Sequence, residues 1–333
     1  MLHASGAIEA VSLSRDEPPM LILPTRRQVL TGLGSASALG LTGAAGYGIG
    51  VEVMHGLVVT RYAPALPGWT AGLRLKVAVL ADFHVCEPFM PLDRVAEIVD
   101  ATNALKPDLV LLLGDYPASG RIAWRKVPLD AFARTVEHLR APLGIHAVLG
   151  NHDWWDDQDA QMRRAGPPEA QRALEARGIP VLENDAVRLV HEGRPFWLAG
   201  LGDQQAFVNR DGNVVAWRDD LPATLAKISD DAPAILMAHE PDIFPEVPDR
   251  FSLTLSGHTH GGQIRLLGVS PAIRRVAGLD LSYGHVVSKG RHIIVSGGFG
   301  VSRVPVRIGV PPEIVWLDLG RDATPAAEAA ANG

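Results

Sequence analysis

Histidines His258 and His260 stand one residue apart in the stretch LSGHTHGGQ, which runs from Leu255 to Gln263. Glycines on both sides leave the backbone free to turn tightly and keep bulky side chains away from the two imidazoles. Two imidazoles held this close are typical of a site for a small cation between loops. Such a cation needs further ligands from other parts of the chain.

Side chains able to bind metal occur at the ends of five apolar runs, and such runs are typical of buried strands. In open α/β sheets, ligands bind beyond the carboxyl ends of the strands, so side chains at five strand ends can converge on one place. The sequence therefore predicts a metal site at these strand ends. Its candidate residues are Asp82, His84, Asp115, Asn151, His152, His239, His258 and His260.

The types of these residues narrow the choice of metal. Imidazole, carboxylate and carboxamide groups suit Mn, Fe or Zn, whereas calcium prefers oxygen ligands alone. Seven ligands from this set are too many for one tetrahedral zinc ion and match two divalent transition-metal ions that share a bridging carboxylate. Two such ions roughly 3.5–4 Å apart form a clamp for in-line displacement at phosphorus. The single cysteine, Cys86, excludes a cysteine-rich zinc site and an intrachain disulfide.

The elements that must position these residues follow a β-α-β-α-β order in the first half of the body. Buried strands are expected over 73–82, 107–115 and 144–150, because these runs are almost continuously apolar. Helices are expected over 92–106 and 129–140, where apolar residues recur at helical spacing. This order argues for a layered α/β core.

The second half of the body predicts more strands than helices. Two short strands surround a turn at Glu192–Gly193, and a helix covers 221–229. Two further strands lead to His239 and to the stretch that contains His258 and His260. A hairpin turning at Lys289–Gly290 and a closing strand over 312–319 complete the body. We expect an α/β fold: a four-layer α-β-β-α sandwich of two mixed sheets, with the metal site at the strand ends.

Five short motifs stand in the order found in the calcineurin-like metallophosphoesterases, and the sequence resembles that family over roughly residues 73 to 318. Each motif is short, but five in order at suitable spacing form a specific signal. The stretch VSGGFGVSRVPVRIGVPPEI resembles the bacterial branch that contains exported phosphodiesterases and a UDP-2,3-diacylglucosamine diphosphatase. The motifs are DFH at 82–84, GDY at 114–116, GNHD at 150–153, AHEPD at 238–242 and GHTHGGQ at 257–263.

The resemblance implies a role for each candidate ligand. The residues implied for the first metal ion are Asp82, His84 and His260, those for the second are Asn151, His239 and His258, and the bridging residue is Asp115. A shared carboxylate offsets charge on both cations, and a water between them becomes hydroxide near neutral pH. His258 and His260 are expected to project from the same side of an extended segment and to reach adjacent metal ions.

The implied reaction is hydrolysis of phosphodiester or pyrophosphate bonds by this metal-bound hydroxide, with His152 as the acid that protonates the leaving oxygen. One position departs from the family pattern. Relatives often carry a second acid three residues after the bridging aspartate, where it orients the catalytic histidine, and Ala118 stands there in this chain. We expect Asp153 or a backbone group to orient His152 instead, or else a less well oriented His152.

Four residues outside the ligand set are candidates for contacts with the substrate. Trp154 and Trp155 directly follow the GNHD motif, where they form either a wall at the mouth of the site or part of the core. Arg303 and Arg307 are candidates for binding a substrate phosphate, which a guanidinium holds in a bidentate way. A surface or structural salt bridge is the alternative for both arginines.

The bulk composition limits the class of protein. Hydrophobic residues make up 47% of the chain, which fits a globular protein, and the net charge of -6 provides no basic surface for nucleic acid. The sequence contains neither a G-x-S-x-G elbow nor a G-x-x-x-x-G-K-[ST] loop, so a serine hydrolase or a P-loop enzyme has no support. A non-catalytic metal-binding scaffold of the same fold is the alternative to a phosphoesterase.

The N-terminal segment is expected to act separately from the body. Arg26 and Arg27 precede an uncharged run to Gly50, and this pattern resembles a twin-arginine export signal. We expect a signal or membrane anchor over 1–55, a metallophosphoesterase domain over 56–320 and a disordered tail over 321–333.

This leader predicts that the protein is exported or membrane-anchored, with the cytoplasmic face of the inner membrane as the alternative. Together with the lipid-processing branch, it favours a membrane-proximal phosphate ester, such as a lipid-linked pyrophosphate, as the substrate.

Overall fold

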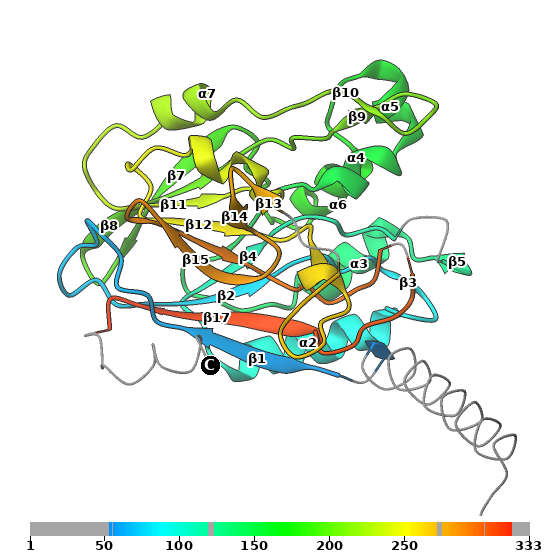
Figure 1. The fold of residues 1–333 in the computed structure, drawn as a ribbon, viewed down its shortest axis with the longest axis horizontal. Helices are drawn as coiled ribbons and strands as arrows, with labels where there is room; N and C mark the ends of the chain where they lie inside the picture. The colour runs from blue at the N-terminus through cyan, green and yellow to red at the C-terminus, as the bar shows by residue number, and fades with distance from the viewer. Residues whose placement is uncertain (1–52, 55, 119–122, 272–274, 303, 322–333) are drawn as a thin grey trace, which may run out of the picture. The chain divides into compact units, whose positions relative to one another are not determined.

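The computed structural model describes residues 53–54, 56–118, 123–271, 275–302 and 304–321 of the chain. These residues form a mixed α/β fold built on two large sheets, with helices and short loops around them (Figure 1). Both sheets contain parallel and antiparallel pairs, so the expectation of two mixed sheets is confirmed.

The first sheet has five strands. β2, β4 and β6 are parallel neighbours, β17 pairs antiparallel with β2, and β1 pairs parallel with β17 at the edge. Because β2, β4 and β6 are parallel, their carboxyl ends lie at the same edge of the sheet. In sheet order the strands are β1 (Val58–Tyr62), β17 (Glu313–Leu319), β2 (Leu75–Leu80), β4 (Leu109–Leu112) and β6 (Ile145–Ala147).

The second sheet has six strands. β8, β11, β12 and β16 run parallel, while β7 and β15 pair antiparallel at the two edges. The two hairpins expected from the sequence are present as β7–β8 and β15–β16. In sheet order the strands are β15 (Gly284–Ser288), β16 (Arg291–Val295), β12 (Leu253–Ser256), β11 (Ala234–Met237), β8 (Arg194–Gly200) and β7 (Asp185–His191).

The two sheets share one hydrophobic core, which alternating side chains supply. Along β2, Val77 and Val79 pack into a cluster with Leu198 of β8 and Ile235 of β11. Between them, Ala78 belongs to a different cluster on the opposite face of the sheet. Successive side chains of a strand point to opposite faces, so β2 is buried on both sides.

Helices cover the other face of the first sheet. In α2 (Leu92–Ala104), the buried residues Val95, Ile98, Val99 and Thr102 recur at helical spacing and so form one apolar stripe. This stripe and that of α3 (Leu129–Val136) pack in the cluster that contains Ala78. The remaining helices are α4 (Asn151–Trp155), α5 (Gln158–Arg163), α6 (Glu169–Glu175), α7 (Leu221–Ala226), η2 (Pro241–Glu246) and η3 (His260–Gly262).

Three short two-stranded pieces lie outside the large sheets. Along the chain, the first strand of each piece follows β2, β8 and η3, respectively. The pieces are β3 (Cys86–Glu87) with β5 (Arg125–Lys126), β9 (Phe207–Val208) with β10 (Val214–Ala216), and β13 (Arg275–Val276) with β14 (Leu279–Asp280).

Candidate metal centre

Loops that follow five strands bring the candidate ligands together. His258 is half-buried, and each of the other candidates is at most 9% exposed. The strands and the residues that follow them are β2 with Asp82 and His84, β4 with Asp115, β6 with Asn151 and His152, β11 with His239, and β12 with His258 and His260. The convergence that the sequence predicted is therefore present.

Left-handed backbone conformations place most of these side chains. A left-handed conformation costs a non-glycine residue roughly 1–2 kcal/mol, so five of them in one site are unusual. The expectation that His258 and His260 project from an extended segment is wrong, because β12 ends at Ser256 and both residues have positive φ. The five residues are Asp82 (φ 52°), His84 (47°), Asp115 (57°), His258 (67°) and His260 (52°).

Two glycines allow the loops to approach each other closely. A Cβ atom at Gly257 would lie 2.5 Å from Asp82 Oδ2. A Cβ atom at Gly150 would lie 2.5 Å from Asp115 Oδ1 and 2.6 Å from His239 Nε2. Any larger residue at either position would therefore push the candidate ligands apart.

The first group of candidate ligands consists of Asp82, His84 and His260, whose ligand atoms lie within 4.8 Å of one another. His84 Nε2 lies 3.0 Å from His260 Nε2, and His260 Nε2 lies 3.6 Å from Asp82 Oδ1. His84 Nδ1 donates to the carbonyl oxygen of Pro117 at 3.0 Å. Because a carbonyl can only accept, this bond leaves the lone pair of neutral His84 on Nε2, which faces the other two ligands.

The second group consists of Asp115, His239 and His258. His239 Nδ1 donates to the carbonyl oxygen of Leu113 at 2.6 Å, which directs Nε2 towards Asp115 Oδ2 at 3.3 Å. Asn151 joins this group, because its Oδ1 lies 2.8 Å from His258 Nδ1. The structure thus brings the three residues predicted for the second metal ion to one side of Asp115.

Asp115 lies between the two groups. Its Oδ2 is 3.3 Å from His239 Nε2 in the second group and 3.5 Å from His84 Nε2 in the first group. Its other carboxylate oxygen, Oδ1, accepts the backbone N–H of His152 at 2.7 Å. One carboxylate oxygen therefore faces ligands of both groups, as a bridging ligand must.

Burial controls the protonation of the first group. Burial lowers the pKa of His84 to about 4, and burial together with nearby His84 holds the pKa of His260 well below its ordinary value. Both imidazoles are therefore neutral at pH 7, the state in which they can bind a metal ion. Burial raises the pKa of Asp82 to about 7.

The second group holds an ion pair when no metal ion is present. Burial opposes charge on both residues, but their mutual attraction prevails: the pKa of His239 lies well above its ordinary value and that of Asp115 well below. His239 Nε2 is buried and makes no well-aligned hydrogen bond to any described residue. A cation that binds this nitrogen must displace a proton, so metal binding there releases protons.

His152 lies beside both groups, and one of its ring nitrogens contacts a carboxylate that was not among the expected residues. Its ring centroid is 4.9 Å from that of His84, and its Nδ1 lies 3.1 Å from Asp156 Oδ2. Burial opposes protonation of His152, but Asp115 and Asp156 outweigh burial and raise its pKa. The four-residue spacing of His152 and Asp156 was visible in the sequence and fits one turn of helix.

Asp153 does not orient His152, so that expectation is wrong. Its carboxylate accepts three backbone N–H groups instead: those of Asp115 at 2.8 Å, Tyr116 at 3.1 Å and Gly150 at 2.8 Å. These bonds join the loop after β4 to the loop after β6. Asp153 is therefore a structural residue that holds two ligand-bearing loops together.

The candidate substrate contact at Trp154 is contradicted by its position. Trp154 is completely buried, and its ring packs edge-on against Phe207 with centroids 5.3 Å apart. Of its two sequence alternatives, the core position is the correct one. Its neighbour Trp155 is half-buried, with its ring centroid 5.3 Å from that of His152, so Trp155 is the tryptophan beside the site.

Arg307 is also unable to contact a substrate. Its side chain is completely buried and donates to the carbonyl oxygens of Gly300 at 2.9 Å, Val310 at 3.0 Å and Gly297 at 2.8 Å. The residue therefore fastens the loop after β16, and the prediction of a substrate contact is wrong. Arg303, the other candidate, lies outside the described residues.

The donor set fits two transition-metal ions. Carbonyl oxygens orient His84 and His239, so each presents Nε2 to a carboxylate, an arrangement that recurs around protein metal sites. The 3.0 Å between the Nε2 atoms of His84 and His260 also suits two neighbouring ligands of one ion at a nitrogen–metal distance of about 2.1 Å.

Comparisons with known proteins agree with this geometry. The sequence profile of the family described as calcineurin-like phosphoesterase matches residues 75–262. The chain belongs to this family. The resemblance inferred from the five motifs is therefore confirmed. Membership implies a metal-dependent phosphoester hydrolase, and the clustered candidate ligands are consistent with it.

Two bacterial relatives match most of the chain. An uncharacterized metallophosphoesterase of Bacillus subtilis, YkuE, is 30% identical over 305 residues, which are 89% of this chain and 97% of the relative. The phosphodiesterase YaeI of Escherichia coli is 30% identical over 275 residues, or 76% of this chain and 89% of the relative. Among solved structures, the NAD nucleotidase of Haemophilus influenzae matches with a TM-score of 0.44 and 16% identity, covering 68% of this chain and 51% of that one.

The expected leader is not part of the described structure. Arg26, Arg27 and the uncharged run to Gly50 lie outside the described residues, as do nearly all residues of the expected tail. None of the helices in the described part of the chain has the length and apolarity needed to cross a membrane.

Proposed function

We propose that this chain is a dinuclear metal-dependent phosphoesterase that hydrolyses phosphodiester or pyrophosphate bonds. The observation that carries the proposal is the place of Asp115, whose Oδ2 lies 3.5 Å from His84 Nε2 and 3.3 Å from His239 Nε2. A single carboxylate facing both ligand groups is the feature that distinguishes a two-metal site from two separate sites. The name of the E. coli relative, a phosphodiesterase, supports the preference for diesters.

Each residue has a defined task in this proposal. Two Mn, Fe or Zn ions would supply a water activated for attack and would offset the charge that develops at phosphorus. His152 donates a proton to the leaving oxygen. The ligands proposed for the first ion are Asp82, His84 and His260, those for the second are Asn151, His239 and His258, and Asp115 bridges the two.

The test is an assay of purified protein with Mn²⁺ against three substrates: an aryl phosphodiester, an aryl phosphomonoester and a nucleotide-sugar lipid. We expect metal-dependent turnover, with the diester or the pyrophosphate-containing lipid preferred over the monoester. Full metal content without turnover of any of the three would favour the alternative, a metal-binding scaffold. The retained His152 beside the metal ligands favours the enzyme.

A lipid-linked substrate is the finer part of the proposal. The turn that follows η3, and so follows His260, exposes three large apolar side chains: Leu266 (64% exposed), Leu267 (104%) and Val269 (65%). Exposed apolar side chains that follow a candidate ligand within a few residues of the chain suit a substrate that carries acyl chains. Replacing Leu266 and Leu267 by serine should raise the KM for the nucleotide-sugar lipid and leave the aryl diester unaffected.

We also propose that the N-terminal segment directs the chain to or across the membrane, since Arg26 and Arg27 precede an uncharged run. Replacing both arginines by lysine should leave the protein in the cytoplasm. An unchanged location in cell fractionation would favour simple anchoring over export.

The proposed architecture is the four-layer α-β-β-α sandwich of the family. Three apolar clusters support this order of layers. One lies between the sheets, one lies under α2 and α3, and the third joins Trp197 and Leu236 to Ile243 of η2.

A further inference from the structure

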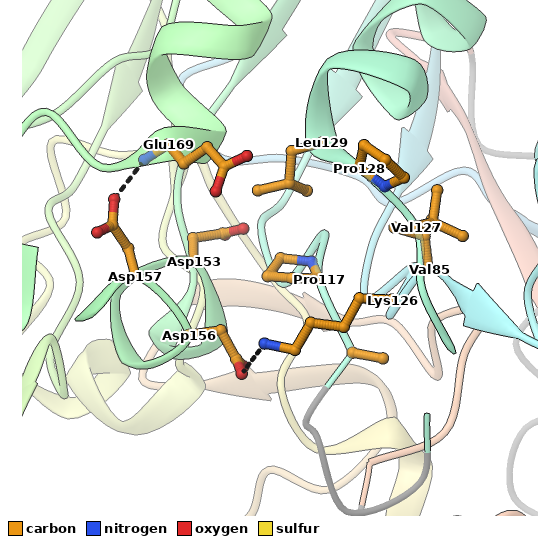
Figure 2. A pocket seen from close by; sticks show the side chains of 11 residues that line it. Val85, Pro117, Lys126, Val127, Pro128, Leu129, Asp153, Asp156, Asp157 and Glu169 are labelled. Atoms are coloured by element: carbon orange, nitrogen blue, oxygen red, sulfur yellow. Dashed lines mark hydrogen bonds and ion pairs between the residues drawn. The ribbon is translucent and has the colours of Figure 1, made fainter. Parts of the chain in front are cut away.

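Position 118, which follows the bridging Asp115 by three residues, carries no acid in this chain. Ala118 is 2% exposed and borders a cavity of about 180 Å³. Pro117, Val127 and Leu129 form an apolar part of the cavity wall, and Lys126 and Asp156 stand at another part of it (Figure 2). Where relatives often carry an acid, this chain therefore has a small apolar side chain beside a cavity.

Asp156 reaches His152 from the end of the same helix, α4, and not from the loop after β4. Asp156 Oδ2 lies 3.1 Å from His152 Nδ1, and Asp156 Oδ1 lies 3.3 Å from Lys126 Nζ. Each oxygen of the carboxylate thus has its own cationic or N–H partner. Figure 2 shows the Lys126 ammonium directed at the Asp156 carboxylate beside the cavity.

Backbone hydrogen bonds also hold His152 and Asp156 in this arrangement, in addition to the side-chain contacts. Asp156 is the C-cap residue of α4, and its N–H donates to the carbonyl oxygen of His152 at 3.1 Å. The backbone N–H of His152 donates in turn to Asp115 Oδ1 at 2.7 Å. One turn of helix therefore sets the distance between the histidine ring and the carboxylate that holds it.

The other nearby acids have different partners. Asp153 accepts three backbone N–H groups, and Asp157 caps α5 through a bond from Ala160 N at 2.9 Å. Among the described residues, Asp156 is the carboxylate whose hydrogen bond to a ring nitrogen of His152 is seen.

We propose that Asp156 is the positioning residue of His152 and that Lys126 holds Asp156 in place. A carboxylate that accepts the Nδ1 proton fixes the ring plane and the tautomer, which leaves Nε2 for the substrate. This inference rests on the proposed function, because it assigns His152 its proton-donating task. It moves the orienting acid from the loop after β4 to the end of α4.

The first test measures kcat for an alkyl phosphodiester with the full-length protein loaded with Mn²⁺. Asp156→Asn should lower kcat roughly 10–100-fold, with KM, metal content and melting temperature close to wild type. Lys126→Met should lower kcat by a smaller factor than Asp156→Asn. Asp159→Asn removes the same charge from the exposed first turn of α5 and should change nothing.

A double-mutant comparison separates positioning from a general structural effect. If Asp156 acts through His152, adding Asp156→Asn to His152→Ala should cause no further loss. An equal loss in both backgrounds would overturn the proposal. Partial recovery of kcat when Ala118→Asp is added to Asp156→Asn would support it further, because the cavity beside position 118 has room for the carboxylate.

A measurement without substrate keeps this inference distinct from the proposed function. In ¹⁵N NMR spectra of the histidine rings, His152 of the wild-type protein should carry a proton on Nδ1, and Asp156→Asn should shift that signal while the other rings stay unchanged. A wild-type His152 without a proton on Nδ1 would refute the positioning role. Absence of turnover with this NMR result intact would refute only the phosphoesterase assignment.

Discussion

Asp115 is the residue on which both halves of the site depend. Its Oδ2 faces His84 on one side and His239 on the other, and its pKa is held well below the ordinary range. The wild-type chain should therefore hold close to two transition-metal ions. Asp115→Asn should weaken both together, because each cation loses part of the same charge.

Elemental analysis after gentle purification with Mn²⁺ checks this prediction. Asp82→Asn is the matched variant, since Asp82 belongs only to the first group and its loss should affect mainly one ion. An Asp115→Asn protein that still carries nearly two ions would show that Asp115 is not the bridging ligand.

His152 should matter in proportion to how much the leaving group needs a proton. General acid catalysis contributes typically 10²–10⁴-fold, and nitrophenolate leaves readily without a proton. His152→Ala should therefore slow hydrolysis of an alkyl diester far more than that of a nitrophenyl diester. Metal content should not change, because His152 is not among the proposed ligands.

Steady-state kinetics on both diesters test this expectation, with the exposed His138→Ala as the control. Equal losses on both substrates with metal retained would point to a positioning role for His152. Loss of metal would move His152 into the ligand set.

Residue types at strand ends were enough to predict which side chains converge, but not how they are oriented. The sequence could not separate Trp154 from Trp155, because the choice depends on which side of α4 faces the core and α4 itself was not expected. The burial of Arg307 was hidden for a related reason. Its three carbonyl partners lie in the same loop between β16 and β17, and no repeating pattern in the sequence shows that this loop folds around the side chain.

At the scale of elements, the junction of β6 and α4 is a closely packed part of the site. Gly150 has an ordinary extended backbone, so its small size is what the junction needs. Gly150→Ala would place a Cβ 2.5 Å from Asp115 Oδ1 and 2.6 Å from His239 Nε2. We expect this variant to fold but to lose most of its metal.

Metal content and melting temperature should be measured together for Gly150→Ala and a control. Gly212→Ala introduces left-handed strain in a turn with open space around the new Cβ, so it should lose stability and keep its metal. Normal metal content in Gly150→Ala would mean that the loops can separate without harm to the site.

The long strands and helices were predicted because their apolar patterns are strong, although every strand that leads to a ligand ends earlier than expected. The run over 73–82 stops pairing at Leu80, since Asp82 turns into the left-handed region. β1 was not predicted as a strand. It is a half-exposed edge strand whose partner, β17, lies some 250 residues further along the chain, so no local signal identifies the pair.

At the scale of the whole molecule, metal ions should stabilise the fold most at neutral to alkaline pH. Without metal, burial raises the pKa values of Asp82 and Asp153 to about 7. A carboxyl group with a raised pKa stabilises the fold while protonated, and this contribution is lost as the pH rises through the folded-state pKa. The lowered pKa of His84 acts only below about pH 6.5, so it does not offset this loss.

We therefore expect the melting temperature of the metal-free protein to fall between about pH 6.5 and pH 8. The metal-loaded protein should show no such fall, because the cations neutralise the buried carboxylates. Thermal unfolding in EDTA and in Mn²⁺ at both pH values provides the comparison. A metal-free protein that is equally stable at the two pH values would contradict this account.

The five left-handed residues also bear on how this chain can change over generations. Glycine would adopt each of these backbone conformations without steric strain, which would relieve a backbone cost of roughly 1–2 kcal/mol per position. Selection for stability thus pulls against selection for chemistry at Asp82, His84, Asp115, His258 and His260. A descendant gene released from the need to hydrolyse its substrate should lose these residues first, and glycine at these positions would mark a lineage that has kept the fold and abandoned the reaction.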